Sequence, residues 1–158
     1  MAVTVLVPID FSVASLNTLK LALESNKDSG VRAILLYAEL LSDSITEMLF
    51  YSPEKIIEKK QTSEFREALE ILNNRYKHDE NEIIIRFLHS YDKNYLISLL
   101  EANRVDKIYL PKNYVLKTRG ASFNPIPLLK STQFPIHETE WEASTNKSEQ
   151  EQLVALFN

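Results

Sequence analysis

Residues 3–23 of the chain, VTVLVPIDFSVASLNTLKLAL, decide the fold class. Residues 3–9 form a near-continuous run of apolar and mostly β-branched side chains, which is typical of a strand buried on both faces of a parallel sheet. Asp10 and Ser12 follow this strand, and Ser12 stands where an N-cap is expected. The residues that then recur at helical spacing are Leu16, Leu19 and Leu23. A buried strand that runs directly into such a helix predicts the first half of a βαβ unit.

The rest of the chain repeats this alternation of strand and helix patterns. The four further strand-like segments are VRAILLYAEL (31–40), EIIIRFLH (82–89), VDKIYL (105–110) and FPIHETEW (134–141). They predict an α/β fold with a doubly wound, mostly parallel five-stranded sheet and helices on both faces. The residues expected in the core include Leu19, Leu23, Leu69, Leu99 and Ile108. A ligand of such a fold lies at the carboxyl ends of the strands, near the topological switch point.

Composition narrows the class of protein. The 158 residues suit one α/β domain over 1–142, followed by a linker and a short C-terminal helix or tail over 143–158. The net charge of −4 disfavours a nucleic-acid partner. There is no cysteine, no apolar run long enough to span a bilayer and no signal-peptide pattern at the start. We therefore expect a cytoplasmic protein with no membrane partner.

Three stretches resemble the universal stress protein family. They are VLVPIDFSVASLNTLKLALE (5–24), YDKNYLISLLEANRVDKIYLPKN (91–113) and STQFPIHETEW (131–141), and the resemblance covers most of residues 1–141. It implies a sheet in the order 3-2-1-4-5, frequent homodimers and, in one branch of the family, bound ATP. In that branch Asp10 and Ser12 would face the ribose, and the backbone near Ala38 would meet the adenine.

The nucleotide-binding branch of the family also carries a glycine-rich phosphate loop, and here the chain departs from the pattern. The corresponding segment is PKNYVLKTRGASFNPIP (111–127), and the whole chain has only two glycines. Pro111, which lacks an amide proton, stands at the first expected glycine. Asn113 and Tyr114 lie near the second, and only Gly120 remains. The sequence therefore predicts that the family's phosphate site is missing.

Several candidate residues have two readings that the sequence leaves open. Asp10 either touches a ribose or closes the turn after the first strand by accepting hydrogen bonds from nearby amides. Three cations, Lys112, Lys117 and Arg119, either contact an anion or form a solvated loop. The histidines, at positions 78, 89 and 137, have no metal-ligand spacing. We identify no catalytic residue and no metal site.

These observations favour a non-catalytic universal-stress-type domain that does not bind ATP in the usual way, needs no cofactor and acts in stress response by associating with an unidentified protein. The alternative is an adenine-nucleotide-binding member, for ATP or AMP, with a divergent basic phosphate loop. A homodimer is expected through the last strand, residues 134–141, although its glutamates Glu138 and Glu140 would repel across a two-fold axis. The terminal apolar cluster either assists this dimer or docks on its own chain. That cluster contains Leu153, Val154, Leu156 and Phe157.

Overall fold

The computed structural model, which describes residues 2–41, 49–141 and 147–157, has a central sheet of five parallel strands in the order β3-β2-β1-β4-β5. The strands are β1 (Val3–Pro8), β2 (Val31–Ala38), β3 (Glu82–Leu88), β4 (Lys107–Pro111) and β5 (Ile136–Thr139). The predicted fold class and strand order are confirmed. Because β1 lies between β2 and β4, the switch point is at the carboxyl end of β1.

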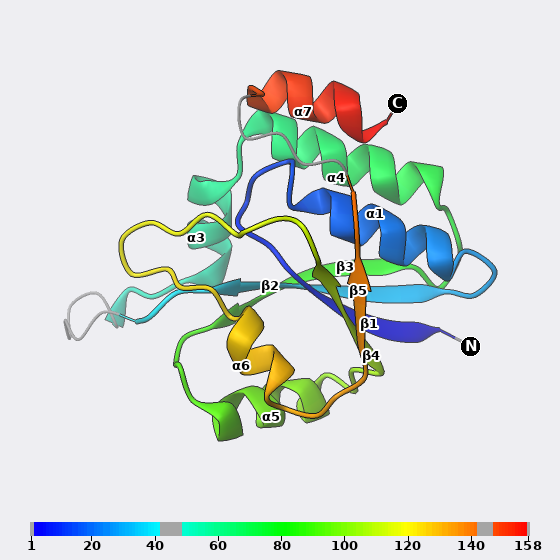
Figure 1. Ribbon diagram of the computed structural model, residues 1–158. Helices are drawn as coiled ribbons and strands as arrows, with labels where there is room; N and C mark the ends of the chain where they lie inside the picture. Colours follow the sequence, from blue (N-terminus) through cyan, green and yellow to red (C-terminus); the bar gives the residue numbers. More distant parts are fainter. Residues whose placement is uncertain (1, 42–48, 142–146, 158) are drawn as a thin grey trace.

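Helices cover both faces of the sheet (Figure 1). They are α1 (Leu16–Ser25), α3 (Pro53–Lys60), α4 (Ser63–Arg75), α5 (Lys93–Ala102), α6 (Ile126–Lys130) and α7 (Glu149–Leu156). One face packs against α1, α4 and α7, and the other against α5 and α6, so that each side of the sheet has its own apolar core. Helix α3 stands beside the carboxyl end of β2.

Side-chain caps start most of these helices where the sequence offers an oxygen. Ser52, Thr62, Asp92 and Ser148 each accept a hydrogen bond from an amide in the first turn that follows. The prediction that Ser12 caps the first helix is wrong, because α1 begins only after Ser15. The Ser12 hydroxyl donates to Asp10 and accepts from the Ser15 amide in the turn that precedes α1, and the Ser12 amide donates to Asp10.

The burial of the core is close to the predicted pattern and differs from it at two positions. Leu19, Leu23 and Ile108 are at most 2 % exposed, as expected. Leu69 and Leu99 are only partly buried and pack at the edges of the two cores. In α4 the fully buried residues are Phe65, Ala68 and Leu72, so Ala68 lies deeper in the core than Leu69, which the sequence predicted to be buried.

The C-terminal helix α7 docks on its own chain. Leu153 and Leu156 are buried in the same core as α1 and α4, and Phe157 packs against that core. Only Val154 of the terminal cluster is largely exposed. Of the two roles that the sequence left open for this cluster, the structure therefore shows intramolecular docking, against helices and not against a sheet edge. No helix among the described residues is long and apolar enough to cross a membrane.

Candidate functional site

Asp10 lies at the switch point, and its carboxylate is fully engaged by the chain itself. One oxygen accepts hydrogen bonds from the Ser12 amide (2.9 Å) and the Ser12 hydroxyl. The other accepts from the Tyr114 hydroxyl (2.6 Å) and the Lys117 amide (2.9 Å). Of the two readings of Asp10, the structure supports the one in which it closes the turn after β1. It also ties that turn to the loop after β4.

Tyr114 fills the space above the start of α1. Its side chain is buried with Leu116 and Ala14, and its hydroxyl lies 3.1 Å from that of Ser12. The Tyr114 ring packs against Trp141 with ring centroids 4.9 Å apart. Burial raises the pKa of the Tyr114 hydroxyl, and the negative charge of Asp10 raises it further. The hydroxyl therefore stays protonated and donates to Asp10.

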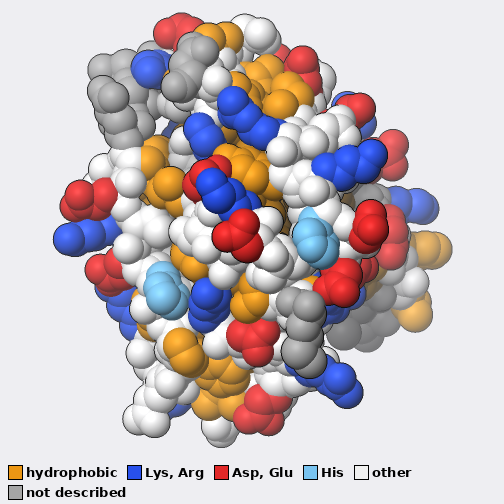
Figure 2. Space-filling view, turned by 90° about the vertical axis from the view of Figure 1, so that its right-hand side faces the viewer, with side chains coloured by type: hydrophobic (Ala, Val, Ile, Leu, Met, Phe, Trp, Pro, Cys, Tyr) orange, Lys and Arg blue, Asp and Glu red, His pale blue; other side chains and the backbone are white. Residues whose placement is uncertain are grey.

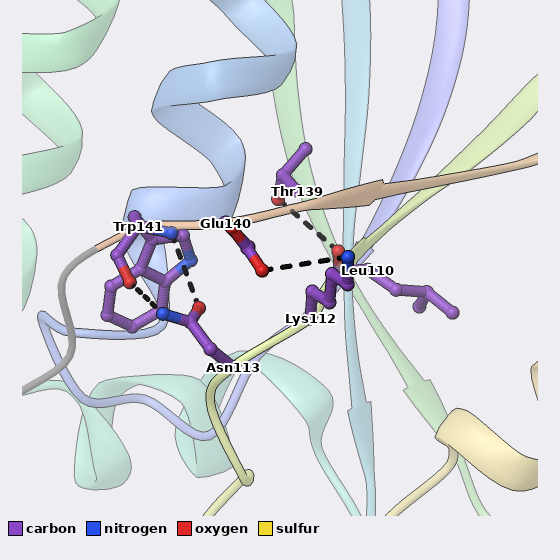
Figure 3. Close-up of polar contacts among 6 residues, drawn as sticks. All are labelled: Leu110, Lys112, Asn113, Thr139, Glu140 and Trp141. Carbon is purple, nitrogen blue, oxygen red and sulfur yellow. Dashed lines mark hydrogen bonds and ion pairs between the residues drawn. The ribbon is translucent and has the colours of Figure 1, made fainter.

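Contacts with the last strand hold this loop in place. Asn113 and Trp141 are bonded in both directions, since the Asn113 amide group donates to the Trp141 carbonyl and accepts from the Trp141 amide (Figure 3). The Trp141 indole N–H donates to Thr18 of α1 at 3.2 Å. The loop after β4 is thus held by Trp141, which lies just beyond the end of β5 and also bonds to α1.

The amides at the start of α1 also have partners from the chain. The Val13 amide donates to a carboxylate oxygen of Glu149, in the first turn of α7, at 3.1 Å. The Ser15 amide donates to the Ser12 hydroxyl at 3.3 Å. Exposed amides at a helix start attract anions. Here Glu149 supplies that negative charge from within the chain.

The backbone near Ala38 also forms hydrogen bonds with other segments of the chain. The Ala38 side chain is buried in the core between the sheet, α5 and α6. Its carbonyl accepts from the Phe123 amide, and the Leu40 amide donates to the Ala121 carbonyl. The loop 121–123 therefore pairs with the end of β2, where the resemblance placed an adenine.

Cations gather in a polar hollow of about 490 Å³ beside Asp10, which we name the basic hollow. Its charged lining residues are Asp10, Lys59, Lys60, Lys117, Arg119, Lys147 and Glu149. Lys60 pairs with Glu39 at 3.3 Å, whereas no carboxylate among the described residues pairs with the other four cations. Lys117 and Arg119 are thus brought together with Asp10 and Ser12.

Lys112 and Ala38 do not belong to this group. The Lys112 ammonium pairs with Glu140, 3.6 Å away along the sheet edge (Figure 3). Three cations of the basic hollow, Lys59, Lys60 and Lys147, were missed by sequence reasoning. For Lys59 and Lys60 a signal existed, because they lie just before α4, and a helix that packs on the sheet between two parallel strands begins at the edge where the first of them ends.

The three histidines lie apart from one another. His89 contacts Tyr51 and the Glu39 carbonyl, His137 stacks on Tyr109, and His78 accepts from the Glu80 amide. Among the residues that the structure describes, no group of three or more histidine, aspartate or glutamate side chains could hold a metal ion.

Comparison with solved structures places this arrangement among known folds. Universal stress protein UspA from Lactobacillus plantarum superposes with a TM-score of 0.55 at 10% identity, over 86% of this chain and 96% of that one. The chain has the universal stress protein fold. The hypothetical protein MJ0577 gives a TM-score of 0.51 at 18% identity, over 89% and 97% of the two chains. No protein-family model and no curated protein matches the sequence.

A universal stress protein family protein from Arabidopsis thaliana, solved with AMP bound, gives a TM-score of 0.49 at 14% identity, over 92% of this chain and 96% of that one. The AMP is a property of that protein. What the present site holds depends on its own side chains.

Proposed function

We propose that this chain is a non-catalytic universal-stress-type domain that does not bind ATP in the manner of the family's nucleotide-binding branch and acts through protein association. The observation that carries this proposal is the hydrogen bond from Tyr114 to Asp10, at 2.6 Å, within a buried cluster. A nucleotide at this position would have to displace a buried aromatic ring and leave polar groups of the chain without partners. Each such buried group costs about 1–3 kcal/mol.

Two further contacts support the proposal. The Val13 amide, in the turn that precedes α1, donates to the Glu149 carboxylate. A phosphate at this position would therefore be repelled by a like charge. The Phe123 amide donates to the Ala38 carbonyl. This carbonyl is then not available as an acceptor for a purine amino group. The Asp10, Val13 and Ala38 contacts are all made by segments of this chain that lie far apart in the sequence.

Calorimetric titration of the full chain with Mg-ATP tests the proposal. We expect no binding in the low micromolar range, which corresponds to about −8 kcal/mol. Heat that fits one site per chain with such an affinity would contradict it.

The basic hollow supports a second candidate function, binding of an adenine nucleotide such as ATP or AMP through side-chain cations. Its support is the four cations that pair with no carboxylate in the described part of the chain, of which Lys117 and Arg119 come from the divergent loop. If ATP or AMP binds, reversing both charges (Lys117→Glu with Arg119→Glu) should weaken binding at least about tenfold. The matched reversal of Lys112 should have little effect, because Lys112 lies outside the hollow and already pairs with Glu140.

For the association itself we propose a homodimer through β5. This strand pairs with β4 on one side, and the Pro135 and Thr139 carbonyls accept from β4 amides. Backbone groups alternate along a strand, so the Ile136 and Glu138 amides point to the outer edge. Glu138 and Glu140 each have a lysine partner, at 3.0 and 3.6 Å, which weakens their repulsion across a two-fold axis.

Replacing Glu138 by proline should convert the dimer into a folded monomer, because proline removes an outward amide. Glu138→Ala is the matched control, since it loses the same carboxylate and keeps the amide. Light scattering should give about twice 18.2 kDa for the natural chain and for the alanine variant, and 18.2 kDa for the proline variant. A natural chain that stays monomeric at high micromolar concentration would rule out the dimer.

A further inference from the structure

A second hollow, of about 540 Å³, lies next to the basic hollow and differs from it in chemistry. Its apolar walls are Leu40, Leu41, Phe50, Ile56 and Ala121. We name it the apolar hollow. Its size is within the range of small-molecule sites. It lies on the β3 side of the switch point, between the end of β2 and helix α3, so it is separate from the Asp10 cluster.

Apolar side chains in and around α3 stay partly exposed among the described residues. Of all the eight residues of α3, none is buried, although Ile56 and Ile57 touch the core. Leu40, Leu41 and Phe50 are 48%, 43% and 79% exposed. An amphipathic helix normally buries its apolar face. The side of α3 that bears Ser52, Lys55, Ile56 and Lys59 faces the hollow instead.

Large exposed hydrophobic side chains are concentrated at this end of the molecule. Apart from Val154, those of the described residues lie in segments that follow β2, β3 or β4, or in the first turn of α5. The side at which β1 begins and α7 ends carries lysine, arginine, aspartate and glutamate among separate hydrophobic areas (Figure 2). The exposed apolar surface around the hollow is therefore a local feature.

A polar pair, His89 and Tyr51, forms part of the lining. His89 Nδ1 lies 2.9 Å from the Glu39 carbonyl, which can only accept, so Nδ1 donates. His89 Nε2 contacts the Tyr51 hydroxyl. Burial raises the pKa of Tyr51, which keeps this hydroxyl protonated. Both side chains therefore have hydrogen-bond partners within the chain.

The charge of the hollow comes from Lys55 and Lys59. Among its described lining residues the one carboxylate, that of Glu39, is paired with Lys60, and no described carboxylate pairs with Lys55 or Lys59. An apolar wall beside these two ammonium groups is complementary to a molecule with an apolar body and one negative end.

We propose that the apolar hollow binds a small amphipathic carboxylate, with its hydrocarbon body against Leu40, Phe50 and Ile56 and its carboxylate at Lys55 and Lys59. This site does not depend on whether the Asp10 cluster excludes ATP. The expected ligand has an apolar body of about ten carbon atoms, which fits the volume of the hollow, and a single negative charge.

The test is calorimetric titration of the full chain with decanoate below its micelle concentration. Decanol and octanoate are titrated separately for comparison. Decanoate should bind one per chain and more tightly than decanol, which has the same body without the charge. Octanoate, which is two methylenes shorter, should bind about fifteenfold more weakly, because each methylene contributes about 0.8 kcal/mol, equivalent to roughly fourfold in affinity.

Variants locate the site. Reversing both lysines (Lys55→Glu with Lys59→Glu) and placing an amide in the wall (Leu40→Asn) should each weaken decanoate at least about tenfold. Lys27→Glu with Lys77→Glu is the matched control, because it makes the same change of net charge at the opposite end of the sheet and should leave binding unchanged.

Four results would overturn the proposal. Decanol could bind as tightly as decanoate, or the control variant could weaken binding as much as the Lys55 and Lys59 variant. AMP could displace decanoate and bind more tightly, which would assign the hollow to a nucleotide. Finally, decanoate could fail to bind to the natural chain.

Discussion

Replacing Leu19 by alanine is expected to lower the free energy of unfolding by about 2–5 kcal/mol. Leu19 is completely buried in the core between α1, α4 and the sheet, so the substitution leaves a cavity that the rigid sheet cannot close. Urea denaturation followed by circular dichroism measures the loss as a lower midpoint at an unchanged slope.

Leu69→Ala is the control for this substitution. The chemical change from leucine to alanine is the same, but Leu69 lies at the edge of the same core and is only partly buried. Its loss should therefore be clearly smaller than that of Leu19. Equal losses, or an unchanged midpoint for Leu19→Ala, would mean that the inward faces of α1 and α4 are misassigned.

The second large effect is expected at the Asp10 cluster. Tyr114→Phe removes one charge-assisted hydrogen bond and should cost about 1.5–3 kcal/mol. Asp10→Ala should cost more, because it leaves the Tyr114 hydroxyl, the Ser12 amide and the Lys117 amide without their acceptor. Urea denaturation of both single variants and the double variant gives their coupling energy.

The coupling energy should exceed about 1 kcal/mol. Tyr109→Phe provides the matched control, because Tyr109 is also buried and its hydroxyl accepts from the neutral side chain of Asn26. Removal of that hydroxyl should cost about 1 kcal/mol and should not depend on Asp10. Additive effects of Asp10→Ala and Tyr114→Phe would mean that the two side chains do not act as a unit.

The strand pattern was sufficient to predict the sheet. Parallel strands that are buried on both faces need uninterrupted apolar runs, and residues 3–9 and 31–38 have them. The position of Asp10 at the switch point followed from the same runs, since the end of a strand is visible in sequence. In α4 the face was predicted less well, because small Ala68 is a weaker signal of burial than Leu69 although it lies deeper.

The hydrogen bonds to Asp10 and Val13 could not be predicted from the sequence. They join segments of irregular backbone that lie far apart in the chain. Tyr114 reaches Asp10 across 104 positions, and Glu149 reaches Val13 across 136. Neither loop has a periodic pattern from which a side-chain direction can be derived. The sequence revealed that the glycines are missing, but not that an aromatic ring takes their place.

The nucleotide content of the purified protein tests the central claim, that the chain itself fills the switch point, most directly. The natural full-length chain is denatured after purification, and the released small molecules are separated by anion-exchange chromatography with detection near 260 nm. Because Tyr114, Glu149 and Phe123 bond to Asp10, Val13 and Ala38, the account predicts far less than one adenine nucleotide per chain. One equivalent of ATP, ADP or AMP per chain would contradict it.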